Sequence, residues 1–122
     1  MDWENLLEEI EGIGRSLYIA ILRQMERIME GLYKWENFKE HPERDDWVEE
    51  ISRARRELRE IFEDSPSLKA IAQNKGTLQR AWKLSVQAMK RWLKSHSFPQ
   101  ECPYTFEQIM EYKPWLIQSS LE

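Results

Sequence analysis

Apolar side chains recur every three or four residues along almost the whole chain, which is the spacing of one side of an α-helix. This pattern predicts helices at about residues 3–11, 16–38, 42–64, 66–95 and 105–112. No run of four or more residues alternates between apolar and polar, as a half-exposed strand would. We therefore expect an all-α protein, a compact bundle of four to five helices that forms a single domain over residues 1–122.

Proline and capping residues mark where several of these helices begin and end. Pro42 ends the second helix, because proline cannot continue a helix and restricts the residue before it. Ser65 and Pro66 begin the fourth helix, as a capping residue followed by proline at the first helical position. Gly76 either kinks or splits that helix, and the sequence does not decide between the two.

The last predicted helix has the clearest N-terminus in the chain. An extended segment at residues 98–104, which contains two prolines, leads directly into it. Thr105 and Gln108 then have the spacing of a capping box, in which each side chain bonds the backbone N–H of the other residue. We expect this helix to stop before Pro114.

The second predicted helix has a wide apolar side. Its apolar residues cover roughly 160° of a helical wheel, whereas an ordinary amphipathic stripe covers about 100°. A helix of this kind contacts more than one neighbour, so it is either central to the bundle or part of a subunit interface. We expect a homodimer whose self-association face includes Leu22, Met25 and Met29.

Composition indicates a soluble, folded protein. Charged residues make up 33% of the chain, above the usual ~25%, and six Trp, four Tyr and four Phe are too many for a disordered chain. The longest unbroken apolar stretch, Tyr18 to Leu22, is far below the ~20 residues that cross a bilayer. The acidic N-terminus does not resemble a signal peptide, and the single cysteine excludes an intramolecular disulfide. We expect a cytoplasmic protein with no membrane contact.

Charge is distributed unevenly along the chain, although the formal net charge is only −4. Residues 65–98 contain seven bases and no acid, whereas every other part of the chain is net acidic. Five bases of the fourth predicted helix fall within roughly 100° of one another, opposite its apolar side: Arg80, Lys83, Lys90, Arg91 and Lys94. This basic stripe either binds nucleic acid, an acidic partner or anionic lipid, or is a solvated face that complements acidic helices of the same or a second subunit.

Residue patterns that carry enzyme chemistry are weak in this sequence. Neither His41 nor His96 has the glutamate three residues earlier that di-metal carboxylate bundles use, so we expect no metal or other cofactor. Cys102 has no recognisable base in the sequence to activate it, and we interpret it as a packed thiol. The sequence contains no Gly-rich phosphate loop and no zinc-ligand spacing. We expect no enzymatic activity and no catalytic residues.

Arg55 is a charged residue at the edge of a predicted apolar face. On the wheel of the third helix it lies between Val48 and Phe62, so its charge needs a partner such as a carboxylate or a helix C-terminus. Two roles fit this position, a buried structural interaction and a contact to an anionic ligand.

Five segments, in order along the chain, together resemble a known family. They read DWENLLEEIEGIGRS, LYKW, WVEEISRARREL, EDSPSLK and FPQECPYTFEQI, and the last is the most specific. They are similar to the successive motifs of the bacterial domain-of-unknown-function family 29. The resemblance covers nearly the whole chain and implies an almost entirely helical protein with no established activity. It also implies signature positions, which we interpret as structural: Glu8, Glu9, Gly14, Arg15, Lys34, Trp35, Trp47, Arg55, Pro66, Cys102 and Pro103.

Two features of the sequence depart from the family pattern. Members usually have a further helix before the first motif, whereas this sequence starts at the motif. The family also often has histidine at the position of Gly31. Without the additional helix, the wide apolar side of the second helix has less of its own chain to cover it, which is the reason to expect a homodimer.

We therefore expect a non-enzymatic helical protein that binds another protein or a second copy of itself. The alternative is a nucleic-acid-binding protein that uses the basic stripe. Non-specific nucleic-acid binding usually requires a basic domain, whereas this sequence has a pI near 5.4, so protein binding is the preferred hypothesis.

Overall fold

A computed structural model describes residues 15–91 and 93–116. Within these residues it contains helices and connecting segments and no strand, which confirms the all-α prediction. The helices are α2 (Arg15–Asn37), α3 (Arg44–Asp64), α4 (Ser67–Gln73), α5 (Lys75–Lys90) and α6 (Phe106–Glu111). The helix predicted at residues 3–11 lies outside the described residues.

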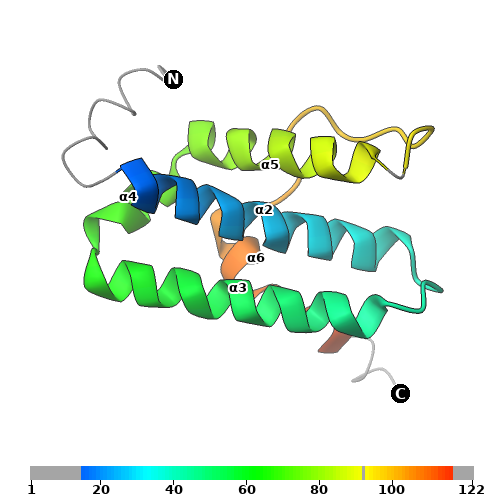
Figure 1. Cartoon of the computed structure of the whole chain (residues 1–122), viewed down its shortest axis with the longest axis horizontal. Coiled ribbons are helices and arrows are strands. Elements are labelled where there is room, and N and C mark those ends of the chain that lie inside the picture. Colours follow the sequence, from blue (N-terminus) through cyan, green and yellow to red (C-terminus); the bar gives the residue numbers. More distant parts are fainter. Residues whose placement is uncertain (1–14, 92, 117–122) are drawn as a thin grey trace.

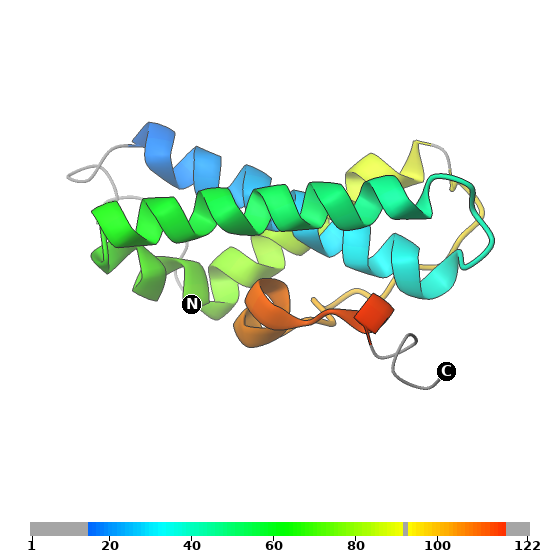
Figure 2. The ribbon, with the colours of Figure 1, turned by 90° about the horizontal axis from the view of Figure 1, so that it is seen from below.

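Helix α2 is central to the bundle (Figure 1). α3 and α5 lie along opposite sides of α2, and α4 and α6 contact it as well. Figure 2 shows α6 next to α3 and α4, on one side of the layer that α2 and α3 form. The wide apolar side of α2 is therefore explained by several neighbours within one chain.

The fourth predicted helix, over residues 66–95, is split into two, which decides between the alternatives left open at Gly76. The helix breaks at Asn74, whose extended backbone separates α4 from α5. The side-chain Oδ1 of Asn74 accepts a hydrogen bond from the N–H of Gly76 at 2.8 Å, so asparagine caps α5 and Gly76 lies in its first turn. α5 then ends at Lys90, earlier than predicted, and the chain continues into turns.

The capping box predicted at the last helix is present in α6. Thr105 Oγ1 accepts a hydrogen bond from the N–H of Gln108 at 3.1 Å, and Gln108 Oε1 accepts one from the N–H of Thr105 at 2.9 Å. Because both bonds join residues three apart, the sequence alone was sufficient to locate this helix start.

The segment that precedes α6 is held against α5 by two side chains. The indole N–H of Trp82 donates to the Pro99 carbonyl at 2.9 Å. The amide of Gln79 donates to the Gln100 carbonyl and accepts from the Cys102 N–H, both at 2.8 Å. These bonds position the segment whose sequence is the most specific part of the family resemblance.

Helices α2 and α3 are in close contact at Gly31. A Cβ atom placed on Gly31 would lie 2.7 Å from Cγ1 and 2.9 Å from Cδ1 of Ile51 on α3. Carbon atoms do not approach this closely in a relaxed core, so the packing of the two helices requires glycine here. For the same reason, the histidine that the family often has at this position does not fit against Ile51 in this arrangement.

Candidate interaction surface

The basic stripe predicted from the sequence lies on the outer side of α5. The exposed residues of α5 are Lys75, Arg80, Lys83, Gln87 and Lys90, so all but the glutamine are basic. The opposite side of α5 is buried, and α5 packs against α2, which fixes the outward direction of the bases. Arg91 and Lys94, just beyond the helix, are also exposed. We refer to Arg80, Lys83, Lys90, Arg91 and Lys94 as the basic face.

The lysines of the basic face have no counter-charge in the described part of the chain. Lys83, Lys90 and Lys94 form no ion pair with any described residue. Arg91 differs, because it lies near the half-buried carboxylates Glu26 and Glu30 of α2. Burial raises the pKa of both carboxyl groups, and nearby positive charges, Arg91 among them, oppose that rise. The three lysines therefore present uncompensated positive charge to solvent.

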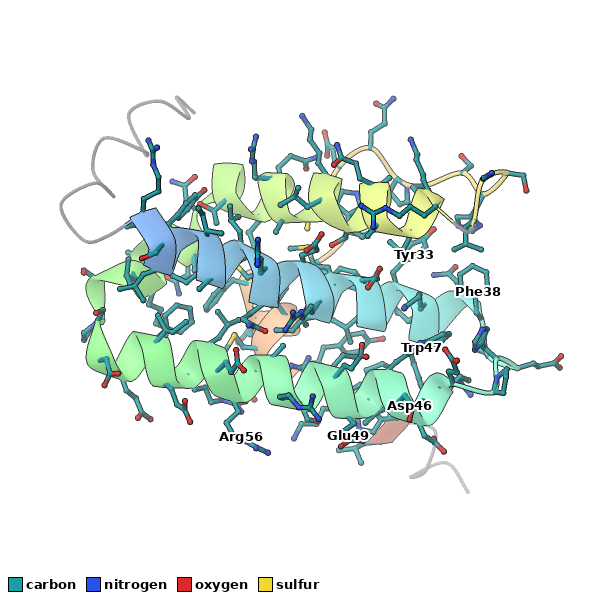
Figure 3. The ribbon with its side chains drawn as sticks, viewed as in Figure 1. Tyr33, Phe38, Asp46, Trp47, Glu49 and Arg56 are labelled. Carbon is teal, nitrogen blue, oxygen red and sulfur yellow. The ribbon has the colours of Figure 1, made fainter. Side chains whose placement is uncertain are left out.

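The outer side of α3 is predominantly acidic and lies at the edge of the bundle opposite α5 (Figure 1). Eight of the exposed residues of α3 are acidic and three are basic. Figure 3 shows Asp46, Glu49 and Arg56 on the side that points away from α2, whereas Trp47 points toward it. The described part of the molecule thus has one basic edge and one acidic edge.

The self-association face predicted on the second helix is not at the surface. Met25 and Met29 have no exposed area, and Leu22 is only 7% exposed. All three belong to the hydrophobic core, which α2 forms with the helices around it. This corrects the prediction: the helical wheel identified an apolar side, but its neighbours are within the same chain, so these residues offer no surface to a second copy.

Arg55 is 2% exposed and binds the C-terminal end of α6. Its Nε donates to the Ile109 carbonyl at 2.7 Å, and its Nη2 donates to the carbonyls of Gln108, at 3.0 Å, and Tyr112. Carbonyls at a helix C-terminus lack helical donors and carry partial negative charge, so a guanidinium is well suited to them. Burial, with the charge of Arg59, lowers the pKa of Arg55 to about 10. The geometry therefore supports the structural role for Arg55 over a contact to a ligand.

A groove lies between the C-terminal half of α3, α4 and α6. It has a volume of about 940 Å³, and its apolar lining includes Phe62, Phe106 and Met110. Three acidic and two basic residues also line it, and one of the bases, Arg59, pairs with Glu111 at 3.6 Å. Because both signs of charge are present and partly paired, the groove selects no class of ligand by charge.

Cys102 is packed and not activated. Its thiol donates to the Tyr104 carbonyl at 3.3 Å, and Sγ lies 4.0 Å from Sδ of Met29. Burial raises the pKa of the thiol, which disfavours the thiolate needed for nucleophilic attack. Among the residues that the structure describes, no three His, Cys, Asp or Glu side chains are grouped so that they could hold a metal ion.

Comparison with known families identifies the family of this chain. The family described as "Domain of unknown function DUF29" matches residues 1–115. The chain belongs to the DUF29 family. No curated protein and no solved structure matches it. None of the helices in the described part of this DUF29 chain is long and apolar enough to cross a membrane.

The described signature positions of this DUF29 chain make contacts within the molecule. The Lys34 ammonium lies 4.9 Å from the ring centre of Trp47, and the Arg44 guanidinium lies 3.5 Å from that of Trp35. Trp35 is 8% exposed and Trp47 is 4% exposed. Together with Arg55, these residues join α2, α3 and α6, so their arrangement is that of fold-determining contacts.

The sequence interpretation missed Glu36, which bonds two tyrosines from the C-terminal part of the chain. Its carboxylate accepts hydrogen bonds from the hydroxyl groups of Tyr104 and Tyr112, the latter at 3.0 Å. Burial and this carboxylate raise the pKa of both tyrosines. The partners lie far along the chain, so no local spacing could indicate the interaction.

Proposed function

We propose that this DUF29 chain is a protein-binding module that holds an acidic segment of a partner on the basic face of α5. The observation that carries the proposal is that Gln87 is the only exposed residue of α5 that is not basic, while Lys83 and Lys90 form no ion pair with any described residue. The fold does not require this arrangement, because the bases lie opposite the buried side of the helix.

Clustered bases cost free energy in the unbound protein. Arg80 and Lys83 are three residues apart on α5, a separation at which like charges on a helix repel each other. An acidic partner would relieve this repulsion on binding. Because the acidic side of α3 lies at the opposite edge, the field of the molecule directs an anionic segment toward α5.

The length and surroundings of the basic face favour a short acidic protein segment over nucleic acid. Arg80 to Lys90 spans about 15 Å of helix. A longer polyanion would extend past the face toward a protein whose formal net charge is −4. A peptide segment of a few acidic residues would contact the basic face alone.

The proposal is tested by fluorescence anisotropy with a labelled glutamate-rich peptide and a labelled DNA duplex of the same charge. Lys83→Glu/Lys90→Glu should weaken peptide binding by about tenfold or more. The matched control is Lys39→Glu/Lys113→Glu, which changes the net charge equally at exposed positions away from α5 and should leave binding unchanged.

Two results would overturn the proposal. One is peptide binding that the α5 variant retains at the wild-type level. The other is markedly tighter binding of the duplex than of the peptide with a steep salt dependence, because that result identifies the basic face as a nucleic-acid surface.

A further inference from the structure

One row of exposed residues along α3 matches the basic face of α5 in charge, and the exposed bases Arg56 and Arg59 lie outside that row. Along α3, Glu50, Glu57 and Glu60 are exposed, and the exposed base Arg53 interrupts them. The Glu57 carboxylate also accepts a hydrogen bond from the Gln24 amide of α2, so Glu57 lies on the flank of this row nearest α2. Along α5, the exposed bases are interrupted by Gln87. Lys83 and Lys90 are seven residues apart, as are Glu50 and Glu57. Each pair therefore spans about 10 Å along its helix.

The match holds in one antiparallel register. If Gln87 is set opposite Arg53, each remaining exposed base of the α5 stripe meets an acid, and the two residue numbers of every pair have the same sum, as antiparallel neighbours require. The opposed pairs are Arg80 with Glu60, Lys83 with Glu57, Gln87 with Arg53, Lys90 with Glu50 and Arg91 with Glu49. Gln87 is the one position of this α5 row without a base, and it lies opposite Arg53, where a second base would be repelled.

The orientation of the helices in one chain permits this pairing between two chains. α3 and α5 lie on opposite edges of the bundle and run in opposite directions (Figure 1). A second copy related to the first by a simple shift would place its α3 antiparallel to the first copy's α5. Since the two surfaces are on opposite edges, the contact is heterologous and repeats from copy to copy.

We infer that the acidic side of α3 of a second copy occupies the basic face of α5, so that the chain assembles head to tail. This inference rests on the proposed function and names the partner of that same face. Exposed ion pairs are individually weak and are screened by salt. The assembly therefore forms at low ionic strength and dissociates as salt is added.

Sedimentation velocity of the full chain at low and high salt tests the inference. The wild-type sedimentation coefficient should rise with protein concentration at low salt only. Lys83→Glu/Lys90→Glu places like charges opposite Glu57 and Glu50, and Glu50→Lys/Glu57→Lys places like charges opposite Lys90 and Lys83, so each variant alone should remain monomeric. An equimolar mixture of the two should assemble, because the reversed positions of one variant again oppose residues of the opposite charge in the other. The Lys39→Glu/Lys113→Glu control should assemble as the wild type does.

Gln87→Glu distinguishes the two proposals even if a charge-reversed variant folds poorly. The new carboxylate would meet Arg53 of a second copy and strengthen self-assembly, whereas it would repel a glutamate-rich peptide and weaken peptide binding. A wild-type chain that is monomeric at low salt, or a mixture that fails to assemble, overturns the inference. If the peptide still binds the basic face in that case, the proposed function stands; if it does not, both fail.

Discussion

The two helices that flank α2 differ in what their positive charges contact. On α3, Arg53 pairs with Glu49 at 3.6 Å and Arg55 binds the carbonyls at the end of α6. On α5, Lys83 and Lys90 have no ion pair with any described residue. Both helices pack against α2. They differ because the bases of α3 can reach the carbonyls of α6, whereas Lys83 and Lys90 of α5 face solvent.

The contrast shows that the number of charged residues on a helix does not determine whether they stabilise the fold or stay exposed to solvent. α3 has five bases, and the most buried of them, Arg55, binds three carbonyls at the end of α6. A base that satisfies the end of another helix stabilises the fold, because the last carbonyls of a helix lack most of their helical donors. A base that faces solvent alone adds little to stability and remains available to a partner.

The largest expected effect is a loss of stability when Arg55 can no longer bind the carbonyls of α6. Arg55→Met keeps the apolar stem but removes the donors to the carbonyls of α6, so we expect the free energy of unfolding to fall by about 3 kcal/mol. Denaturant unfolding followed by circular dichroism measures it. Arg56→Met, one residue later and exposed, is the matched control and should change stability by less than about 0.5 kcal/mol. Equal losses at the two positions would contradict the assignment of Arg55 as the cap of α6.

Local patterns predicted much of this fold, and contacts between distant segments account for the rest. The Thr105 capping box and the outward direction of Lys83 follow from spacing within one helix, so the sequence alone was sufficient. The wheel of α2 identified an apolar side but not whether Met25 would meet its own chain or another copy. A break near Gly76 was one of two alternatives, but its position two residues earlier, where Asn74 makes the cap, was not predicted because Gly76 was the more prominent signal.

Arg55 shows the same limit for a residue that the sequence singled out. Its place at the edge of an apolar face indicated that it needs a partner such as a carboxylate or a helix C-terminus. The partner itself, the C-terminal end of α6, lies more than fifty residues along the chain. Only the packing of α6 on α3 brings the two together, and no periodicity in the sequence encodes that approach.

An intermediate effect is expected where α3 approaches α2. Gly31→Ala should gain helix propensity of about 1 kcal/mol, but its new Cβ would meet Ile51 at 2.7 Å. We therefore expect a net loss of about 1–2 kcal/mol in the free energy of unfolding. Adding Ile51→Val, which removes Cδ1, should recover part of this loss in a double-mutant cycle. A more stable Gly31→Ala protein would show that the contact is looser than the structure indicates.

The smallest effect is expected at the border between α2 and the basic face. Burial and the charges of Glu26 and Glu50 raise the pKa of Glu30, against the opposing effect of Lys34 and Arg91. The folded state therefore holds this proton more tightly than the unfolded chain, so Glu30 lowers stability as pH rises from the ordinary carboxyl range toward neutrality. Glu30→Gln should remove that dependence and stabilise the protein at pH 7 by about 0.5 kcal/mol.

Glu30→Gln also tests whether Glu30 affects binding at the basic face. Thermal melts across this pH range, with Glu60→Gln as the control for losing one exposed charge, isolate the contribution of burial at Glu30. Loss of the Glu30 charge also removes a negative neighbour of Arg91, so the glutamate-rich peptide should bind the variant more tightly than the wild type. A stability gain without tighter binding would show that Glu30 affects the stability of the fold but not peptide binding. The functional surface would then be confined to the lysines of α5.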